Sequence, residues 1–210
     1  KPRLFFGVNA GAMDSMVNHY TAGKRLRSND AYTPNGIANQ RPDYAVKVYS
    51  NILKELYPDV PVVIGGIEAS LRRFAHYDYW QDKLKKSILL DSGADLLIYG
   101  MGEKPVTELV GKLADIDGAV NVRQFRCVVT KSPVKQTVVA FGSKNEIPGG
   151  ITDTDIVLHP HSLCLKNKKC QAENFRHIEE ESNKYDARRI IQEAEGRWVV
   201  VQPPYQPLTQ

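Results

Sequence analysis

The sequence has little of what would mark a secreted or membrane protein. It contains only three cysteines, Cys127, Cys164 and Cys170, and no Cys-x-x-Cys pair, which excludes a disulfide framework and suits a reducing cytoplasm. Its longest apolar runs, residues 94–99 and 198–201, fall far short of the roughly 20 residues that a membrane helix needs. No charged-then-apolar leader opens the chain, although Lys1 is not a start methionine. We therefore expect a cytoplasmic protein without a membrane partner.

Strong charge of one sign is also absent. The 210 residues carry a net charge of +4, with 28 Lys and Arg spread among 24 Asp and Glu. This balance is too weak to support a nucleic-acid or membrane partner by itself. With 42% hydrophobic residues the chain can bury a core of one medium domain, or one domain plus an appendage.

The first half alternates between strand-like and helix-like segments. The expected order is a strand at 3–8, a long polar loop at 18–42, a helix at 43–57, a strand at 61–64, a helix at 79–90, a strand at 94–99 and a helix opened by Pro105. Parallel strands with helical crossovers account for this alternation most simply. The fold class predicted is α/β, a Rossmann-like parallel sheet flanked by helices.

The alternation of strand-like and helix-like segments ends after Asp117-Gly118, where a β-rich and helical appendage is expected. We predict a strand pair at 122–130 and 136–141, a strand at 156–158, a helix at 166–182 with Ala172, Phe175 and Ile178 inward, and a hairpin at 188–202. A Pro-rich tail follows from Gln202, with the composition of an extended linker. The predicted division is 1–118, 119–201 and 202–210.

Glycines follow the strands at 3–8, 61–64 and 94–99, in loops 9–15, 65–73 and 100–103. In an open parallel sheet, ligands bind beyond the carboxyl ends of the strands, so these loops are expected to share one rim. Neither the loop at 65–73 nor the loop at 100–103 matches GxGxxG or GxxxxGK[ST], which leaves a nucleotide site poorly supported. For each glycine alone, a tight strand-to-helix turn is the better explanation.

The stretch around the second loop, VVIGGIEASLRRFAHYDYW, is dense in charged and aromatic residues. Arg72 and Arg73 could clamp a phosphate or carboxylate, or could be solvated and paired with Asp78 or Asp82. The aromatic residues could wall a pocket or simply pack in the core. The candidate ligand- or substrate-facing residues are Asn9, Asp14, Gly65, Gly66, Glu68, Arg72, Arg73, Tyr77, Asp78, Tyr79, Trp80, Gly100, Gly102 and Glu103.

No catalytic or metal centre emerges from spacing. His159, His161, Cys164 and Cys170 form HxHxxCxxxxxC, which fits no common structural zinc pattern, so packing is the better account and no metal site is expected. The five histidines are scattered, and no Ser-His-Asp or Cys-His arrangement can be argued.

Long motifs resemble one family over nearly the whole chain. GGIEASLRRFAHYDYW, SILLDSGADLLIYGMGE, FGVNAGAMDSMVNHYTAGKRLRSNDAYTP, RPDYAVKVYSN, CLKNKKCQAENFRHIEEESN and VVVQPPYQPLT are similar to the N-terminal region of YgiQ-type radical SAM proteins. The likeness weakens mainly across residues 115–155.

The resemblance implies an accessory region that is not a catalyst alone. In this family a later barrel holds a 4Fe-4S cluster with a CxxxCxxC triad and binds S-adenosylmethionine, and no cysteine here has that spacing. The resemblance also implies an earlier strand and helix before Lys1, and a barrel in cis after the Pro-rich tail. The loops at 65–80 and 100–103 would then help to enclose an unknown substrate. Arg72 and Arg73 would bind an anionic group, Glu68 and Glu103 would orient polar atoms, and residues 77–80 would supply an apolar wall.

A binding module is the alternative. The loops GGIEAS and YGMGE look like turns in cobalamin-binding-type domains of other radical SAM enzymes, which supports the Rossmann-like sheet. The lower-ligand motif DxHxxG is missing, which weakens the case for cobalamin without closing it. A partner protein or RNA would be the other ligands of such a module.

Overall fold

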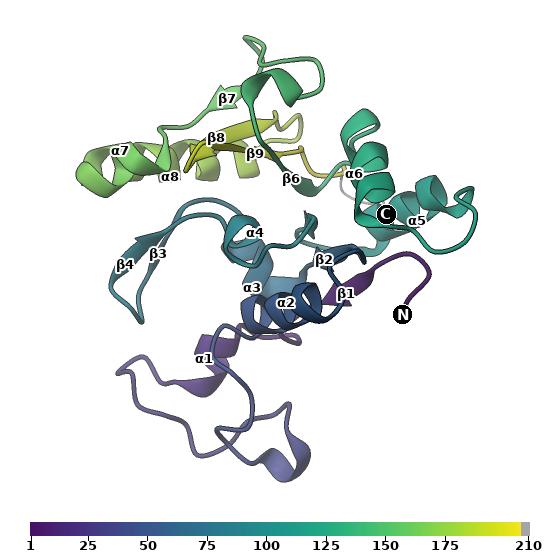
Figure 1. Ribbon diagram of the computed structural model, residues 1–210. Coiled ribbons are helices and arrows are strands. Elements are labelled where there is room, and N and C mark those ends of the chain that lie inside the picture. The colour runs from purple at the N-terminus through teal and green to yellow at the C-terminus, as the bar shows by residue number, and fades with distance from the viewer. Residues whose placement is uncertain (207–210) are drawn as a thin grey trace.

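The computed structural model describes residues 1–206 (Figure 1). In chain order the elements are β1 (Phe6–Val8), α1 (Ser15–His19), the 3-10 turn η1 (Pro34–Gly36), α2 (Ala45–Leu56), β2 (Val62–Ile64), α3 (Gly66–Leu71), β3 (His76–Asp78), β4 (Lys83–Lys85), α4 (Ile88–Asp91), β5 (Leu96–Ile98), α5 (Glu103–Ala114), α6 (Val122–Lys131), β6 (Thr137–Phe141), η2 (Lys144–Glu146), β7 (Ile156–Val157), α7 (His161–Lys166), α8 (Lys168–Ser182), β8 (Ile190–Ala194) and β9 (Arg197–Val201).

A mixed sheet in the order β1-β2-β5-β6-β9-β8-β7 organises the chain. The strands β1, β2 and β5 run parallel, with Phe6 opposite Val62 and Val63 opposite Leu96. The strands β6, β9 and β8 continue the sheet in antiparallel fashion, and β7 pairs parallel to β8. The α/β, Rossmann-like prediction is therefore confirmed for the first half, and the second half extends the same sheet.

Both faces of the central strands are covered. Every residue of β2 and β5 is buried. Val62 and Ile64 face one apolar cluster, with residues of α2, α3 and α4, whereas Val63 faces the other. Leu109 of α5 and Phe125 of α6 fill that second cluster and are fully buried. Continuous apolar runs such as VVI and LLI are typical of strands buried on both faces.

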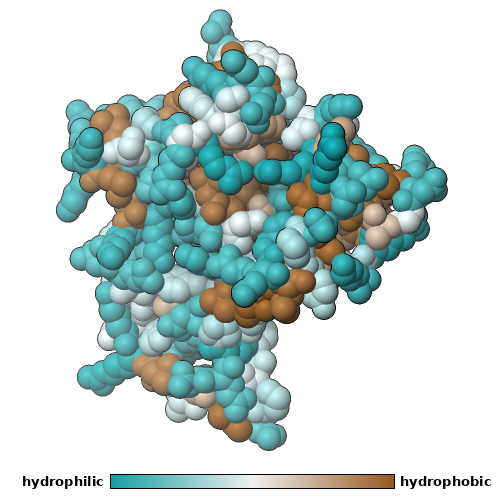
Figure 2. All heavy atoms as spheres, viewed as in Figure 1, coloured by the Kyte–Doolittle hydropathy of each residue, from teal (hydrophilic) through white to brown (hydrophobic). Residues whose placement is uncertain are grey.

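The helix predicted at 43–57 is confirmed as α2, but its apolar stripe is only partly inward. Ala45 and Val46 are fully buried, whereas Ile52 and Leu56 are 46% and 64% exposed. Figure 2 shows apolar side chains gathered at the surface over α2. The predicted polar loop at 18–42 holds only the end of α1, the turn η1 and two isolated bridges, between Tyr20 and Leu26 and between Asn29 and Ile37.

The helix predicted at 79–90 is wrong. A hairpin of β3 and β4 occupies the first part, with Tyr77 opposite Leu84. The buried carboxylate of Asp78 accepts the Gln81 amide at 3.0 Å, which closes the turn, and Asp82 adopts a left-handed φ of 52°. Only α4 is helical, and the Ser87 hydroxyl caps it.

The strand predicted at 122–130 is also wrong, because this segment is the helix α6. Asn121 and Gln124 form a reciprocal capping box at its start. Phe125 and Val129, four residues apart, are its buried positions. The predicted strand at 136–141 is confirmed as β6, and it pairs with β5 and β9.

The C-terminal predictions are mostly confirmed. The helix expected at 166–182 exists as α8, preceded by α7 and capped by Asn167. Its expected inward residues Ala172 and Phe175 are exposed instead, while Ile178 packs against the core. The hairpin β8–β9 forms as predicted, and residues 207–210 of the Pro-rich tail lie outside the described residues. Among residues 1–206, no helix has the length and apolar character needed to span a bilayer.

Candidate functional site

The loops after β1, β2 and β5 meet at one edge of the sheet and line a cavity of about 390 Å³. We call this edge the carboxyl rim, defined by residues 9–11, 65–66 and 100–102. The candidate residues Asn9, Gly65, Gly66, Gly100 and Gly102 all lie on the cavity wall. The convergence expected from the order of strands and helices is confirmed.

Close approach of neighbouring loops explains the glycine pair. Gly66 has a φ of +77°, and a Cβ there would lie 3.3 Å from Cβ of Asn9. A Cβ on Gly65 would lie 3.2 Å from the carbonyl oxygen of Ile98. Crowding at the rim therefore favours glycine at both positions, and the positive φ adds to this at Gly66.

A second cavity, of about 220 Å³, lies between α1, the end of α3 and the β3–β4 hairpin. We call it the aromatic hollow; its lining residues are Asp14, Val17, Leu71, Arg72, His76, Tyr77, Asp78, Tyr79 and Trp80. The structure thus brings together six of the candidates named from the sequence. The hairpin, rather than the expected helix, places the aromatic side chains there.

Arg72 is committed to an ion pair within this hollow. Its guanidinium pairs with the carboxylate of Asp14, and Nη1 also donates to the Glu68 carbonyl at 3.2 Å. Burial alone would lower the pKa of Arg72, but the contacts with Asp14 outweigh it and the pKa is raised. The hollow therefore presents a charge-compensated pair rather than a free cation.

Arg73 points to a different place, so the two arginines do not form a clamp. Its Nη1 donates to the Ser70 carbonyl at 2.7 Å, and its guanidinium lies 5.0 Å from the ring centroid of Tyr99 and 5.1 Å from that of Phe74. Burial lowers the pKa of Arg73. It lines a separate cavity of about 120 Å³ beside Glu181 and Arg188.

The two glutamates have different surroundings. Glu68 is 1% exposed and its carboxylate accepts the amides of Ser15 at 2.9 Å and Val46 at 3.0 Å. It therefore joins the first turns of α1 and α2. Glu103 is exposed in the first turn of α5, beside the rim, where it lines a cavity of about 500 Å³ with Tyr99 and Tyr205.

Hydrogen bonds fix the hydroxyl groups of the two tyrosines of the hollow, while their rings stay partly exposed. The Tyr77 hydroxyl donates to Asp82 at 2.6 Å, and that of Tyr79 donates to the Ala22 carbonyl at 2.7 Å. The side chains of Tyr77 and Tyr79 are 58% and 47% exposed. The Trp80 ring lies 5.2 Å from that of Tyr79. Such fixed, partly exposed rings can hold an apolar or planar group.

Asp78 is buried beneath these rings. Its carboxylate accepts the Tyr44 hydroxyl at 3.1 Å and lies 3.0 Å from the ammonium of Lys85. Burial raises the pKa of Asp78, but hydrogen bonds from the Gln81 amide, Lys85 and Tyr44 outweigh it, and the net pKa is lowered. The residue is a fixed anion that organises the hairpin.

His76 is a residue of the hollow that the sequence analysis missed. Its Nδ1 lies 3.1 Å from the Phe74 carbonyl, so Nδ1 carries the proton, and its Nε2 is buried without a hydrogen-bond partner among the described residues. Burial lowers the pKa of His76 to about 4, which keeps the ring neutral near pH 7. A lone histidine inside HYDYW gives no signal of this before the hairpin is known.

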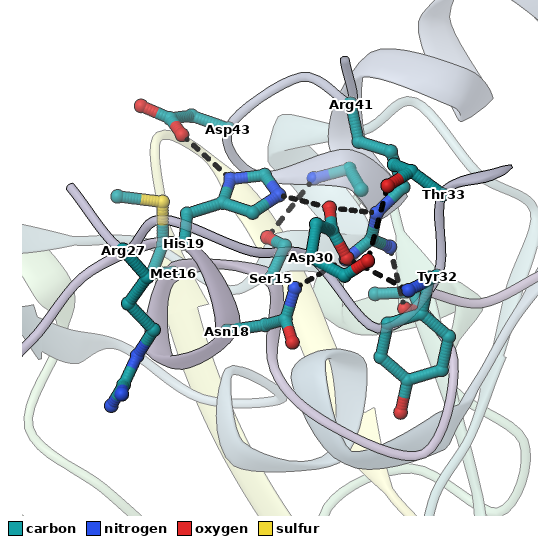
Figure 3. Close-up of polar contacts among 12 residues, drawn as sticks. Ser15, Met16, Asn18, His19, Arg27, Asp30, Tyr32, Thr33, Arg41 and Asp43 are labelled. Atoms are coloured by element: carbon teal, nitrogen blue, oxygen red, sulfur yellow. Dashed lines mark hydrogen bonds and ion pairs between the residues drawn. The ribbon is translucent and has the colours of Figure 1, made fainter. Parts of the chain in front are cut away.

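A second missed feature is the polar network that orders the loop 20–42 (Figure 3). The buried ring of His19 lies 3.0 Å from Asp43 and 3.3 Å from Asp30. Arg41 donates to Asp30 at 2.8 Å and 3.2 Å, and Asn18 donates to it at 2.7 Å. The partners lie 11 to 24 positions apart, and all but Asn18 and His19 are in irregular chain, so no spacing rule could identify them.

Comparison with known proteins places the chain. The family model described as Radical SAM N-terminal matches residues 1–210. The chain belongs to this family. Among curated relatives, a UPF0313 protein of Bacteroides thetaiotaomicron is 57% identical over 214 residues, covering 100% of the chain and 34% of the relative. UPF0313 proteins of Porphyromonas gingivalis and Geobacter sulfurreducens are 52% and 45% identical and are covered over 31% and 32% of their lengths.

The Radical SAM N-terminal chain thus spans about a third of the length of the curated relatives it matches. It corresponds to the N-terminal region of UPF0313 proteins, as the resemblance of its motifs predicted. No solved structure matches.

The cysteines of this Radical SAM N-terminal region do not fit an iron–sulfur cluster. A 4Fe-4S cluster needs several thiolates around one point. Cys127 is exposed on α6, whereas Cys164 and Cys170 are buried on α7 and α8. We therefore assign no cluster ligand and no step of cluster chemistry to residues 1–206.

Proposed function

We propose that this chain is the N-terminal accessory region of a longer radical SAM protein and helps to enclose the substrate of a barrel that follows it. The 4Fe-4S cluster and S-adenosylmethionine would belong to that barrel, where the bound cofactor supplies radical initiation. The region itself would position the substrate, shield it and exclude water from it. The convergence of three loops on the carboxyl rim is the observation that carries this proposal.

The course of the last described residues supports the rim as the side that meets the barrel. The backbone amide of Gln136 donates to the Pro203 carbonyl at 2.8 Å. The side-chain Nε2 of Gln136 donates to the carbonyls of Tyr99 at 2.6 Å and Met101 at 2.5 Å. Tyr205 donates its hydroxyl to Glu108 of α5. The chain is thereby fixed beside the turn at 100–102, so a segment that continues from it begins next to the rim.

Apolar side chains at the rim support a covering partner in cis. Met101 is 73% exposed, Leu71 65%, Ile67 49% and Val106 38%. Met101 lies in the rim itself and Val106 lines the rim cavity, whereas Ile67 and Leu71 lie on α3, which begins at the rim. Exposed apolar groups on and beside one edge are typical of a surface that another part of the protein covers.

The aromatic hollow is the proposed place for part of the substrate. Tyr77, Tyr79 and Trp80 would hold an apolar or planar portion, while the Asp14–Arg72 pair would accept and donate hydrogen bonds at the edge. This differs from the anion clamp expected from the sequence, since Arg73 lies in another cavity. We therefore infer a substrate that does not need two neighbouring negative charges in order to bind.

Cysteine labelling of the full-length protein tests the covered rim. Met101→Cys and Leu71→Cys would be compared with Phe175→Cys and Leu165→Cys, which replace side chains of similar exposure, 60% and 58%, on α8 and α7. Peptide mass spectrometry after a maleimide pulse gives each rate. We expect labelling at 101 and 71 at least about tenfold slower than at 175 and 165. Equal rates at all four positions would refute the covering of the rim.

Anaerobic reconstitution tests whether the barrel alone holds the cluster while this region serves the substrate. Iron content and 5′-deoxyadenosine release would be measured for the full-length protein with and without residues 1–206. We expect the shortened protein to keep its iron and to release 5′-deoxyadenosine without coupling to product. Loss of iron on a soluble, folded truncation would instead place cluster ligands or their support in this region.

A further inference from the structure

Outside the rim and the hollow, three metal-ligating side chains converge between the β7–α7 junction and α8. The imidazole of His159, the thiol of Cys170 and the carboxylate of Glu173 place one ligand atom each within 4.8 Å of one another. Nε2 of His159 lies 2.9 Å from Oε2 of Glu173. Cys170 and Glu173 are three residues apart on α8 and therefore share one helix face.

We propose that His159, Cys170 and Glu173 bind a divalent metal ion, with Zn²⁺ as the fitting species. Imidazole nitrogen, thiolate sulfur and carboxylate oxygen are the three ligand types that zinc uses in proteins. The mixture of a soft sulfur with harder nitrogen and oxygen favours zinc over magnesium or calcium, which prefer oxygen alone. Three protein ligands leave the fourth tetrahedral position for water or another group.

Buried neighbours hold the backbone of His159 in a single place. Asn174, which is 1% exposed, accepts the His159 amide at 2.8 Å and donates to the His159 carbonyl at 3.0 Å. The side chain of Gln192, 3% exposed, donates to the same carbonyl at 3.2 Å. These contacts fix the backbone that carries the imidazole, and loss of outer contacts around a metal ligand weakens metal binding.

Cys164 belongs to this supporting shell rather than to the ligand set. Its sulfur accepts Nδ2 of Asn174 at 3.2 Å and lies 3.7 Å from the His159 carbonyl. The Cys164 thiol is therefore placed to donate to that carbonyl.

An ion has access to the site from one side. The side chains of His159 and Glu173 are 39% and 37% exposed, whereas Cys170 is only 8% exposed. The thiol is thus the buried ligand, and the imidazole and carboxylate are the ligands that solvent reaches. Bound zinc would tie the end of β7 to α8. The sequence pattern HxHxxCxxxxxC hides this arrangement, because Glu173 lies outside it and His161 faces elsewhere, towards Lys47, Asp91 and Glu195.

Metal content of the full-length protein is the first test. Zinc and iron would be counted separately by plasma mass spectrometry in the wild type, in Cys170→Ser and in Cys127→Ser. Cys127 is exposed on α6 and provides the matched control. We expect one zinc per chain in the wild type and the control, and none in Cys170→Ser. Zinc that remains at one per chain in Cys170→Ser would overturn the proposal.

Cobalt substitution tests the ligands directly. Full-length protein in which the cluster cysteines of the barrel are replaced by Ser would be stripped of metal and titrated with Co²⁺ alone, because free cluster thiolates would give the same signal; all variants are made in this background. The titration is followed by the near-ultraviolet sulfur-to-cobalt absorption band. We expect a band that saturates at one equivalent in the wild type and in Cys127→Ser, and is absent in Cys170→Ser. Absence of a saturable band in the wild type, or an unchanged band in Cys170→Ser, would contradict the site.

Two further variants keep the test decisive if Cys170→Ser fails to fold. Glu173→Gln changes a partly exposed side chain and should weaken Zn²⁺ binding by at least about tenfold. Asn174→Ser removes the support of His159 and should weaken it about 10- to 100-fold. Unchanged affinity in both variants would leave only the His159–Glu173 hydrogen bond as the reason for their contact, and the metal site would be rejected.

Discussion

Asp14 and Arg72 form an ion pair at the aromatic hollow although 58 positions separate them in the sequence. Asp14 also caps α1, because its carboxylate accepts the amides of Met16 at 2.9 Å and Val17 at 3.3 Å. Arg72 follows α3 directly. The pair therefore fastens the start of α1 to the end of α3, on the side where the candidate site lies.

Arg72→Ala should destabilise the protein by about 3 kcal/mol, since it leaves the carboxylate of Asp14 buried without its partner. The side chains are 13% and 4% exposed, so water can replace the guanidinium only in part. Urea unfolding measures the difference. Arg176→Ala is the control: this arginine is 66% exposed and pairs with Glu180 at 3.7 Å, and its loss should cost less than about 0.5 kcal/mol. Equal losses in both variants would contradict the structural role of the pair.

The strands of the parallel half were predictable because their signal is local. Each is a short run of buried aliphatic residues that ends near glycine, as in residues 61–66 and 94–100. The helix α2 was predictable for the same reason, since Pro42 and Pro58 bracket it. The rim followed from topology alone: parallel strands place their carboxyl ends at one edge.

The two wrong predictions have different causes. Residues 79–90 have helical spacing, but Asp78 closes a local turn through the Gln81 amide and pairs with Lys85 across the hairpin. Residues 122–130 are rich in valine, yet Phe125 and Val129 bury one helix face against α5 and the sheet. A turn thus outweighs helical spacing in the first segment, and packing outweighs β propensity in the second.

The chemistry of the site was the least predictable part. The residue types in the hollow could be named from GGIEASLRRFAHYDYW, but not their partners. Asp14 comes from another loop, and Arg73 turns away from Arg72 to contact Tyr99. Ion pairs between distant segments depend on the finished fold, and neither composition nor spacing encodes them.

Gly66→Ala should destabilise the protein by about 1–2 kcal/mol, because its φ of +77° strains an L-residue and its Cβ would crowd Asn9. Gly111→Ala is the matched control. Gly111 is exposed within α5, and no atom lies within 4 Å of the added Cβ, so the change should stabilise by about 0.5–1 kcal/mol. Chemical denaturation gives both values, and a neutral Gly66→Ala would show that the rim tolerates a side chain.

Asp30 should make stability depend on acid. Burial raises the pKa of Asp30, but hydrogen bonds from Arg41, the Tyr32 amide and Asn18 outweigh it and lower the pKa to about 2. The unfolded value is about 3.9, so the contribution is complete above about pH 4 and is lost as the pH falls towards 2. It amounts to about 2 kcal/mol near neutral pH.

The variant Asp30→Asn should therefore lose stability at pH 7 and show a shallower decline between about pH 4 and pH 2. Asp153→Asn, at an exposed position, serves as the comparison and should follow the wild type at pH 7. Urea midpoints across this range measure both slopes. A parallel shift of Asp30→Asn, with the wild-type slope retained, would contradict the lowered pKa.

His76 should destabilise the fold at mildly acidic pH. Burial lowers its pKa to about 4, whereas the unfolded value is about 6.5. The unfolded chain therefore binds a proton that the folded chain does not, and this contribution to stability, complete above about pH 6.5, is lost as the pH falls to about 4. In His76→Gln the decline over that window should be shallower by at most about 1.4 kcal/mol per pH unit. Proton NMR of the His76 ring gives an independent check, with an expected midpoint near pH 4; a midpoint above about pH 6 would mean that the ring is hydrated and accessible in the hollow.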